Sequence, residues 1–148
     1  MARFTAVVDT PAPPERTWKA LTDWPSHGRW VPLTRVTVLT PSASGVGARF
    51  VGRTGLGPLA VDDPMEVVEW REPAPGVPGH CRVVKQGRVV LGEASFDVVE
   101  HARGSRVTWT EDVEIAPIRL TRPFGGLVAL AGRLAFTRSL RAMARELA

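Results

Sequence analysis

The sequence predicts an α+β fold in which a curved, seven-stranded antiparallel sheet packs against one long C-terminal helix. Three observations lead to this prediction. Stretches with the two-residue alternation of strands succeed one another over residues 35–115, with only Gly- and Pro-rich turns between them. One further alternating stretch opens the chain, ahead of two short helical segments. Residues 123–148 carry the periodicity of a single helix, and laying that helix across the sheet buries the most apolar surface.

The N-terminal part of the chain is expected to form a strand and then a short helix. Residues 3–9 alternate between apolar and polar side chains, and the prolines after them suit the first turn of a helix over residues 15–22. Trp18 and Leu21 are three residues apart, so they share the buried edge of that helix. The helix ends before Pro25, because the residue preceding a proline disfavours the helical conformation.

A second helical turn over residues 26–30 leads into the six remaining strands. These strands are predicted at residues 35–39, 47–55, 65–70, 80–85, 89–99 and 106–115. Because no helix interrupts the series, each strand is expected to pair with the next in an antiparallel meander. No linker or repeat divides the chain, so residues 1–148 are expected to form a single domain.

The C-terminal helix has a sheet-facing stripe that is small in its first half and bulky in its second. A spacing of 100° per residue places seven residues on this stripe: Gly125, Ala129, Gly132, Phe136, Leu140, Met143 and Leu147. Such a helix would close on the sheet at its C-terminal end and stand over a gap at its N-terminal end. Because protein interiors are close-packed, we interpret the gap as a ligand cavity. The alternative is that loops or the tip of the sheet fill it.

The cysteine, histidine and glycine content argues against a metal or cofactor. Cys81 is the single cysteine, which excludes an internal disulfide and a cysteine-based metal cage. His27, His80 and His101 lie in separate segments without the spacing of metal ligands. The glycines form neither a dinucleotide-binding fingerprint nor a phosphate loop. We therefore expect neither metal nor cofactor.

The charge and hydropathy patterns exclude two further classes of partner. The net charge is +4, but the arginines are spread along the chain and form no phosphate track, so nucleic acid is not an expected partner. No apolar run approaches the roughly 20 residues that span a bilayer, which argues against integral membrane association. The N-terminus alternates like a strand and lacks the apolar core of a signal peptide, so a cytoplasmic location is expected.

Glu111 is the candidate catalytic residue. In the strand at residues 106–115 it shares one face with Val107, Trp109 and Val113, which are all apolar. A carboxyl on this inward face would have its pKa raised by desolvation unless an arginine paired with it. It would then serve as a general acid or base, or bind a polar group of a ligand. The alternative is a solvated or salt-bridged position at the rim of the sheet.

The ligand contacts are expected from aromatic side chains on the strands and from the small half of the last helix. Buried aromatics mostly serve packing, which is the alternative role for each of them. The candidate ligand-binding residues are Trp30, Phe50, Phe96, Trp109, Glu111, Gly125, Ala129 and Gly132.

Several short motifs, taken together with the order of the elements, resemble one known superfamily. They lie at residues 21–25 (LTDWP) with 30–32 (WVP), 45–50 (GVGARF), 65–70 (MEVVEW) and 104–110 (GSRVTWT). In order and spacing these motifs resemble the START-like (SRPBCC, helix-grip) superfamily, and most closely its polyketide cyclase/dehydrase-like branch of small bacterial proteins. The resemblance covers about residues 4–147. It implies the helix-grip fold, but the superfamily includes lipid carriers, hormone receptors, cyclases and dehydratases, so it does not fix the function.

Three functions follow as hypotheses. The leading one is binding of a small hydrophobic molecule, lipid- or polyketide-like, between the sheet and the last helix. The first alternative is a polyketide cyclase or dehydratase, which needs at least two polar groups in the cavity, whereas the sequence offers Glu111 alone. The second is an interaction module, because Leu127, Leu130 and Leu134 form another apolar helix face that would suit a homodimer or a membrane surface. The sequence names neither the ligand nor the pathway.

Overall fold

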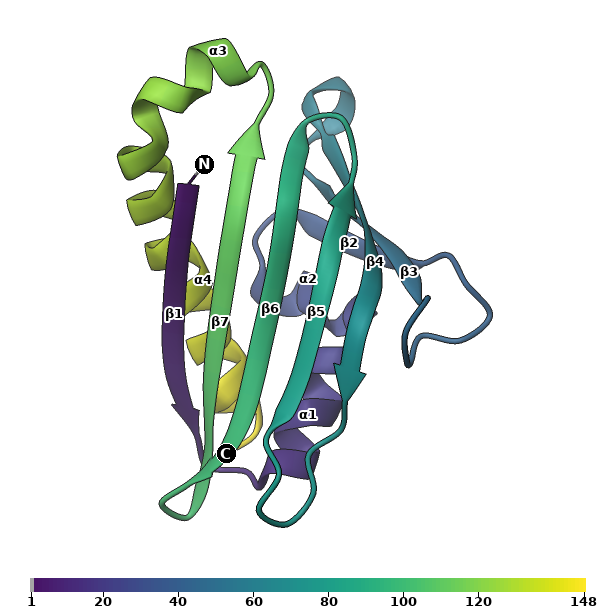
Figure 1. Cartoon of the computed structure of the whole chain (residues 1–148), viewed down its shortest axis with the longest axis vertical. Helices are drawn as coiled ribbons and strands as arrows, with labels where there is room; N and C mark the ends of the chain where they lie inside the picture. Colours follow the sequence, from purple (N-terminus) through teal and green to yellow (C-terminus); the bar gives the residue numbers. More distant parts are fainter. Residues whose placement is uncertain (1) are drawn as a thin grey trace.

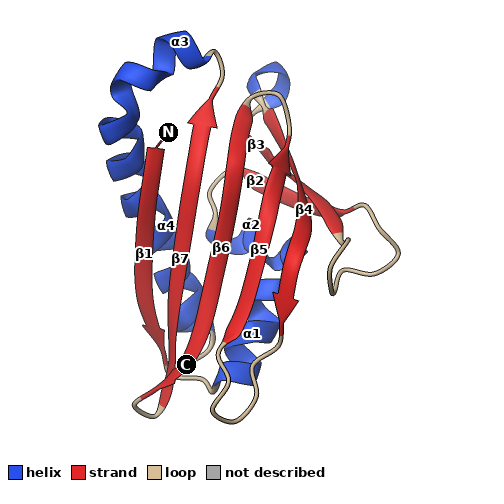
Figure 2. Ribbon diagram, viewed as in Figure 1, coloured by secondary structure: helices blue, strands red, loops and turns tan. Residues whose placement is uncertain are grey.

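Seven antiparallel strands form one curved sheet, and α1, α2 and α4 lie on the same face of it (Figure 1 and Figure 2). The computed structural model describes residues 2–148. The strands are β1 (Ala2–Thr10), β2 (Thr34–Val38), β3 (Arg49–Thr54), β4 (Val61–Arg71), β5 (Gly79–Gln86), β6 (Val90–His101) and β7 (Gly104–Ile115). Their order in the sheet is β1-β7-β6-β5-β4-β3-β2, so six consecutive strands form a meander and β1 joins its last strand.

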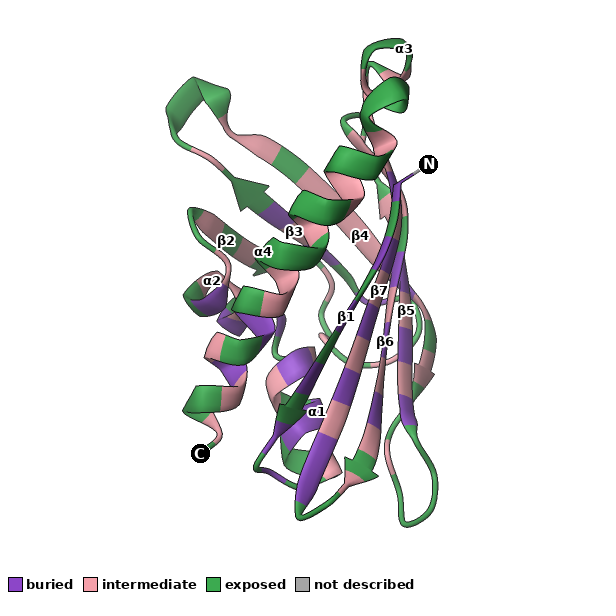
Figure 3. Cartoon of the chain, turned by 90° about the vertical axis from the view of Figure 1, so that its left-hand side faces the viewer, coloured by how far each residue is buried: buried purple, intermediate pink, exposed green. Residues whose placement is uncertain are grey.

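The longest helix, α4, packs against the sheet beside β1. The helices and single helical turns are α1 (Pro14–Thr22), η1 (Trp24–Ser26), α2 (His27–Trp30), η2 (Gly57–Leu59), α3 (Ile118–Thr121), η3 (Arg122–Phe124) and α4 (Gly125–Glu146). Figure 3 shows exposed positions recurring along α4 and buried positions along the strands behind it. Within the described part of the chain, no helix is long and apolar enough to cross a membrane.

The predicted fold class, element order and strand number are confirmed, and two boundaries differ by more than two residues. β4 begins at Val61 and not at Met65. The residues missed are Asp62, Asp63 and Pro64, which are poor strand formers but pair in register with β3. Helical structure ahead of α4 likewise begins earlier than predicted, in α3.

A bulge in β4 changes which of its side chains face the helices. The pairing of β4 with β5 shifts between Val67 and Glu69. One extra residue reverses the alternation of a strand, and Trp70 therefore turns to the inner face. Its ring lies there at a centroid distance of 5.1 Å from Trp18 of α1. The bulge thus adds an aromatic residue to the core that a strict two-residue period would place outside.

The small residues of α4 bring the helix close to β1 instead of leaving a gap. A methyl group built at Gly132 would overlap the ring of Phe4 and lie 2.8 Å from its Cδ1, so this ring already occupies the space. In the bulky second half of the stripe, Leu140 and Met143 are buried, and Phe136 and Leu147 are half-buried against the core. The stripe therefore faces the sheet, but the expectation that its small half stands over a gap is wrong at Gly132. Small side chains allowed close packing here and made no void.

Candidate functional site

A cavity of about 120 Å³ lies between the inner face of the sheet and the helices α2 and α4. Phe136 is the residue of α4 that lines it, and the strands β2 to β7 supply most of the wall. The lining residues are Trp24, His27, Val31, Thr34, Val36, Phe50, Gly52, Thr54, Asp63, Met65, Val83, Lys85, Ala94, Phe96, Trp109, Glu111 and Phe136. An apolar cavity of about 150 Å³ holds benzene, so this space suits a molecule of about one ring.

Small residues on the strands make this space. Ala94 of β6 lies between Val83 and Glu111, its partners on either side. Gly52 of β3 faces the cavity, and a methyl group built there would meet only Cε of Met65, at 3.9 Å. The void therefore arises from the strands and not from the glycines of α4.

Stacked aromatic rings form the apolar wall. Trp24 stacks on Phe50 with ring centroids 4.2 Å apart. Trp109 lies between Phe96, at 5.3 Å, and Phe136, at 5.5 Å. Rings packed at these distances gain attraction beyond the burial of their surface. The wall is therefore a continuous set of rings that pack against one another.

A buried ion pair lies on the polar side of the cavity. Nζ of Lys85 donates a hydrogen bond to Oδ2 of Asp63 at 2.7 Å, and the side chain of Lys85 is only 4% exposed. Burying a charge is costly unless it is paired, so Asp63 is what allows Lys85 to be here. The other oxygen of Asp63, Oδ1, is buried and has no hydrogen-bond partner among the described residues.

Glu111 is buried beside this pair. Its Oε1 accepts a hydrogen bond from Nε1 of Trp109 at 3.2 Å. Burial raises the pKa of Glu111 above its ordinary value; the charge of Lys85 and the bond from Trp109 oppose this rise, and the charge of Asp63 adds to it. The side chain is thus held protonated to higher pH than a solvated glutamate. The inward position predicted for Glu111 is confirmed.

His27 adds a neutral imidazole to the same cavity. Its Nε2 lies 2.6 Å from the carbonyl oxygen of Leu21, and because a carbonyl only accepts, Nε2 carries the proton. Burial lowers the pKa of His27, while the bond to Leu21 and the charge of Asp23 raise it less. The neutral tautomer therefore leaves Nδ1 as a hydrogen-bond acceptor.

The structure brings four of the predicted site residues together and separates the other four. Phe50, Phe96, Trp109 and Glu111 line the cavity. Trp30 does not, because its Nε1 donates to Oε2 of Glu146 at 3.0 Å in the groove between α2 and α4. The three small residues of α4 do not line it either: Gly125, Ala129 and Gly132.

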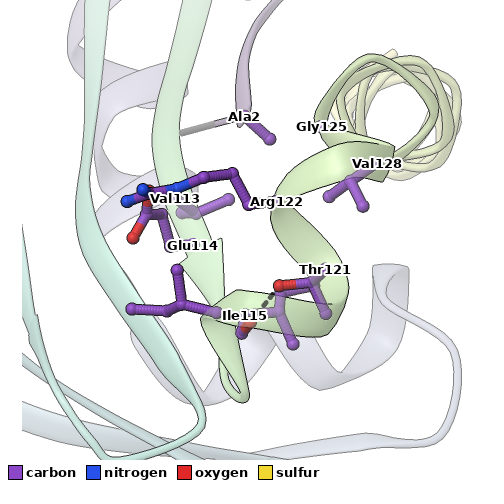
Figure 4. A pocket seen from close by; sticks show the side chains of 9 residues that line it. Ala2, Val113, Glu114, Ile115, Thr121, Arg122, Gly125 and Val128 are labelled. Carbon is purple, nitrogen blue, oxygen red and sulfur yellow. Dashed lines mark hydrogen bonds and ion pairs between the residues drawn. The ribbon is translucent and has the colours of Figure 1, made fainter.

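Gly125 belongs to a separate depression of about 20 Å³ where β7 ends and α4 begins (Figure 4). The turn beside it is held by the hydroxyl of Thr121, which donates to the carbonyl oxygen of Ile115. Arg122 reaches Glu114 across the same depression, at 3.5 Å. The space accommodates about one water molecule. It is too small for an organic ligand.

Sequence reasoning missed Lys85, Asp63 and His27. Lys85 carried a usable signal, because it shares the two-residue period of β5 with the buried residues Cys81 and Val83. Asp63 lay outside the predicted strand. His27 carried no such signal, since its place depends on how α2 folds over the sheet.

The remaining reactive groups offer no further chemistry. Cys81 is fully buried, and desolvation raises the pKa of its thiol to about 12, so no thiolate nucleophile exists at neutral pH. The residues that the structure describes contain no group of three His, Cys, Asp or Glu side chains placed to hold a metal ion. The chemistry available in the cavity is hydrogen bonding and proton transfer by the four titratable groups above, with the hydroxyls of Thr34 and Thr54 as further hydrogen-bonding groups.

Comparison with known proteins identifies the family. Residues 1–148 match the family model described as polyketide cyclase / dehydrase and lipid transport. A search of curated protein sequences finds no match.

Solved structures share the fold at low identity. TTHA0849 from Thermus thermophilus has a TM-score of 0.79 and 17% identity over 98% of this chain and 96% of that one. The Zhui aromatase/cyclase from Streptomyces sp. R1128 has a TM-score of 0.68 and 14% identity over 97% of this chain and 93% of that one. The lipid transfer and protein localization domain of human StarD13 has a TM-score of 0.68 and 14% identity over 95% of this chain and 76% of that one. With the family match over its whole length, the chain belongs to the polyketide cyclase/dehydrase and lipid transport family.

Proposed function

We propose that this protein binds a small hydrophobic molecule in the cavity between the sheet, α2 and α4. The cavity itself carries the proposal, because about 120 Å³ stays open inside an interior that is elsewhere packed. Aromatic walls with a few convergent polar groups are the usual form of small-molecule sites. The description of the family, which joins lipid transport to cyclase chemistry, agrees with this role.

We further propose that four of the lining residues contact the ligand. Phe50, Phe96 and Trp109 would stack on it or pack around it, and Glu111 would meet its polar part. Native mass spectrometry of freshly purified protein tests the proposal directly, by showing whether a small molecule co-purifies.

A cavity-filling variant provides the matched test. Gly52→Leu places a side chain in the cavity with one ordinary contact nearby, so the fold should persist with a stability change below about 1.5 kcal/mol. Binding of a single-ring probe, 4-propylphenol, measured by calorimetry should weaken at least about tenfold. Val51→Leu is the control, because Val51 lies on the opposite face of the same strand. Equal binding by Gly52→Leu and the unaltered protein would contradict this site.

A cyclase or dehydratase is the second candidate, and the convergence of Glu111 with Lys85, Asp63 and His27 favours it. Glu111, held protonated, would act as general acid on a polyketide-like substrate. Glu111→Gln should then retain substrate affinity and lose a factor of about 10²–10⁴ in rate. For a protein that only binds, the same change alters affinity for polar ligands and nothing else.

We also propose a homodimer through Leu127, Leu130 and Leu134, which are 66%, 51% and 61% exposed. Large apolar side chains gathered on one exposed helix face are typical of contact surfaces. A cytoplasmic location stays a prediction, which cell fractionation would test.

A further inference from the structure

The polar side of the cavity is balanced in charge, and this balance restricts what can bind. We propose that the cavity accepts a neutral molecule of about one ring, whose hydroxyl or carbonyl oxygen lies against Lys85, Asp63 and Glu111, and that it rejects carboxylates and phosphates. The inference rests on the proposed function, since it names the chemical class of the ligand for the same cavity.

The positive charge in the cavity is already compensated. Lys85 donates to Asp63 at 2.7 Å, and with its side chain 4% exposed it cannot turn to solvent. No arginine is among the described residues that line the cavity. An anionic ligand would therefore have to compete with Asp63 for Lys85 and lie near a carboxylate in a space of low polarity, where like charges repel strongly.

Burial acts against charge on the other two titratable groups. It raises the pKa of Glu111 and lowers that of His27, so desolvation favours the neutral form of each side chain. A cation would have to share Asp63 with the ammonium group of Lys85, whose positive charge would repel it. A ligand without net charge is the one that leaves this balance intact.

The cluster nevertheless has hydrogen bonds to offer. A protonated carboxyl at Glu111 has one O–H to donate, which suits a carbonyl or hydroxyl oxygen. Asp63 Oδ1 is a buried acceptor without a partner among the described residues, and a rotation of the carboxylate that turns it toward the cavity would let a ligand hydroxyl supply the missing donor. A hydrocarbon would leave both groups unpaired, so it should bind more weakly than its hydroxylated counterpart.

Three probes of one shape separate these possibilities: propylbenzene, 4-propylphenol and 4-propylbenzoate. They differ only at one ring position: propylbenzene carries no polar group there, 4-propylphenol carries a neutral hydroxyl, and 4-propylbenzoate carries a carboxylate. By calorimetry at pH 7, we expect the phenol to bind at least about tenfold tighter than the other two.

Asp63→Asn provides the decisive variant, because it leaves the charge of Lys85 without its partner. Binding of 4-propylbenzoate should then improve at least about tenfold, while binding of 4-propylphenol weakens. Asp62→Asn is the matched control: Asp62 is exposed and pairs with Arg53 at 3.0 Å, so this change should alter no probe. Glu111→Gln is a second variant with an independent readout: it leaves the Lys85–Asp63 pair intact, so binding of 4-propylbenzoate should not improve, whereas the affinity for 4-propylphenol changes.

The outcomes distinguish the inference from the function on which it rests. Equal affinity for all three probes, or a preference for the benzoate in the unaltered protein, would overturn the neutral-ligand inference and leave hydrophobic binding standing. A failure of all three probes to bind would remove the proposed function and this inference together. A gain of benzoate binding in Asp63→Asn, and not in Asp62→Asn, supports the inference that Asp63 compensates the charge of Lys85.

Discussion

Glu111 shows how strongly one residue can be shaped by its neighbours. On an exposed strand it would be an ordinary carboxylate, but it is 6% exposed beside Trp109, in a cavity that also holds Lys85 and Asp63. Its inward direction follows from the alternation of β7 alone, which is why it could be predicted. Its partners could not, because Lys85 and Asp63 come from strands far away in the sequence.

The raised pKa of Glu111 predicts how stability depends on pH. Its folded pKa lies above the ordinary value of 4.5, so the folded state binds more protons and this residue's contribution to stability falls as pH rises through the folded pKa. Glu111→Gln removes this loss, and the variant should gain stability relative to the unaltered protein as pH increases. Urea unfolding at several pH values from about 4 to about 8, a range that covers the usual upward shifts of buried carboxyl groups, measures the difference.

The other buried titratable group of the cavity, His27, does not disturb that measurement. Its folded pKa is lowered below the ordinary 6.5, so its contribution is present above that pH and is lost as pH falls. Both proteins contain His27, and its effect therefore cancels in the difference between them. A difference that does not change with pH would show that Glu111 is not perturbed.

At the scale of the element, the helix α4 illustrates what a pattern can and cannot predict. The face that meets the sheet follows from a period of 3.6 residues, and the structure confirms it. What this face meets is set by residues distant in the sequence: at Gly132 the ring of Phe4 from β1 occupies the space that the small residues suggested was a gap. The actual cavity depends on Gly52 and Ala94, which come to line one space only once the sheet has formed.

Substitution of the two helix glycines tests this packing. Ala is about 1 kcal/mol better than Gly in a helix, so Gly126→Ala, with nothing within 4 Å of the new methyl group, should be neutral or stabilising. Gly132→Ala should instead force Phe4 aside, so its free energy of unfolding should be lower than that of Gly126→Ala by about 1–3 kcal/mol. Thermal or urea unfolding of the two variants measures the difference. Equal stability would mean that the helix stands away from β1 after all.

At the scale of the whole molecule, the sequence predicted the fold better than the site. Strand alternation, turns and the terminal helix are local signals, and together they allow few arrangements. Four of the eight predicted contacts line the cavity, and all four lie on strands. The four that do not line it are Trp30 and the small residues of α4, whose surroundings are set by how the helices dock, which no local pattern encodes.

The last prediction concerns the assembly of two molecules. A symmetric dimer through Leu127, Leu130 and Leu134 would bring Arg138 of each copy near the same interface, because a spacing of about 100° per residue places this exposed side chain within about 20° of Leu127. Leu130→Glu should shift the association toward monomer in analytical ultracentrifugation. Leu59→Glu is the control, since Leu59 is 85% exposed but lies in η2, away from α4.

Salt distinguishes this dimer from one held by ion pairs. Arginines of the two copies repel one another, and salt screens that repulsion with a Debye length of about 10 Å at 0.1 M and about 3 Å at 1 M. Added salt should therefore strengthen the dimer, whereas an interface built on opposite charges would weaken. A protein that stays monomeric at all salt concentrations, or a dimer that Leu130→Glu leaves unchanged, would exclude this face as the interface.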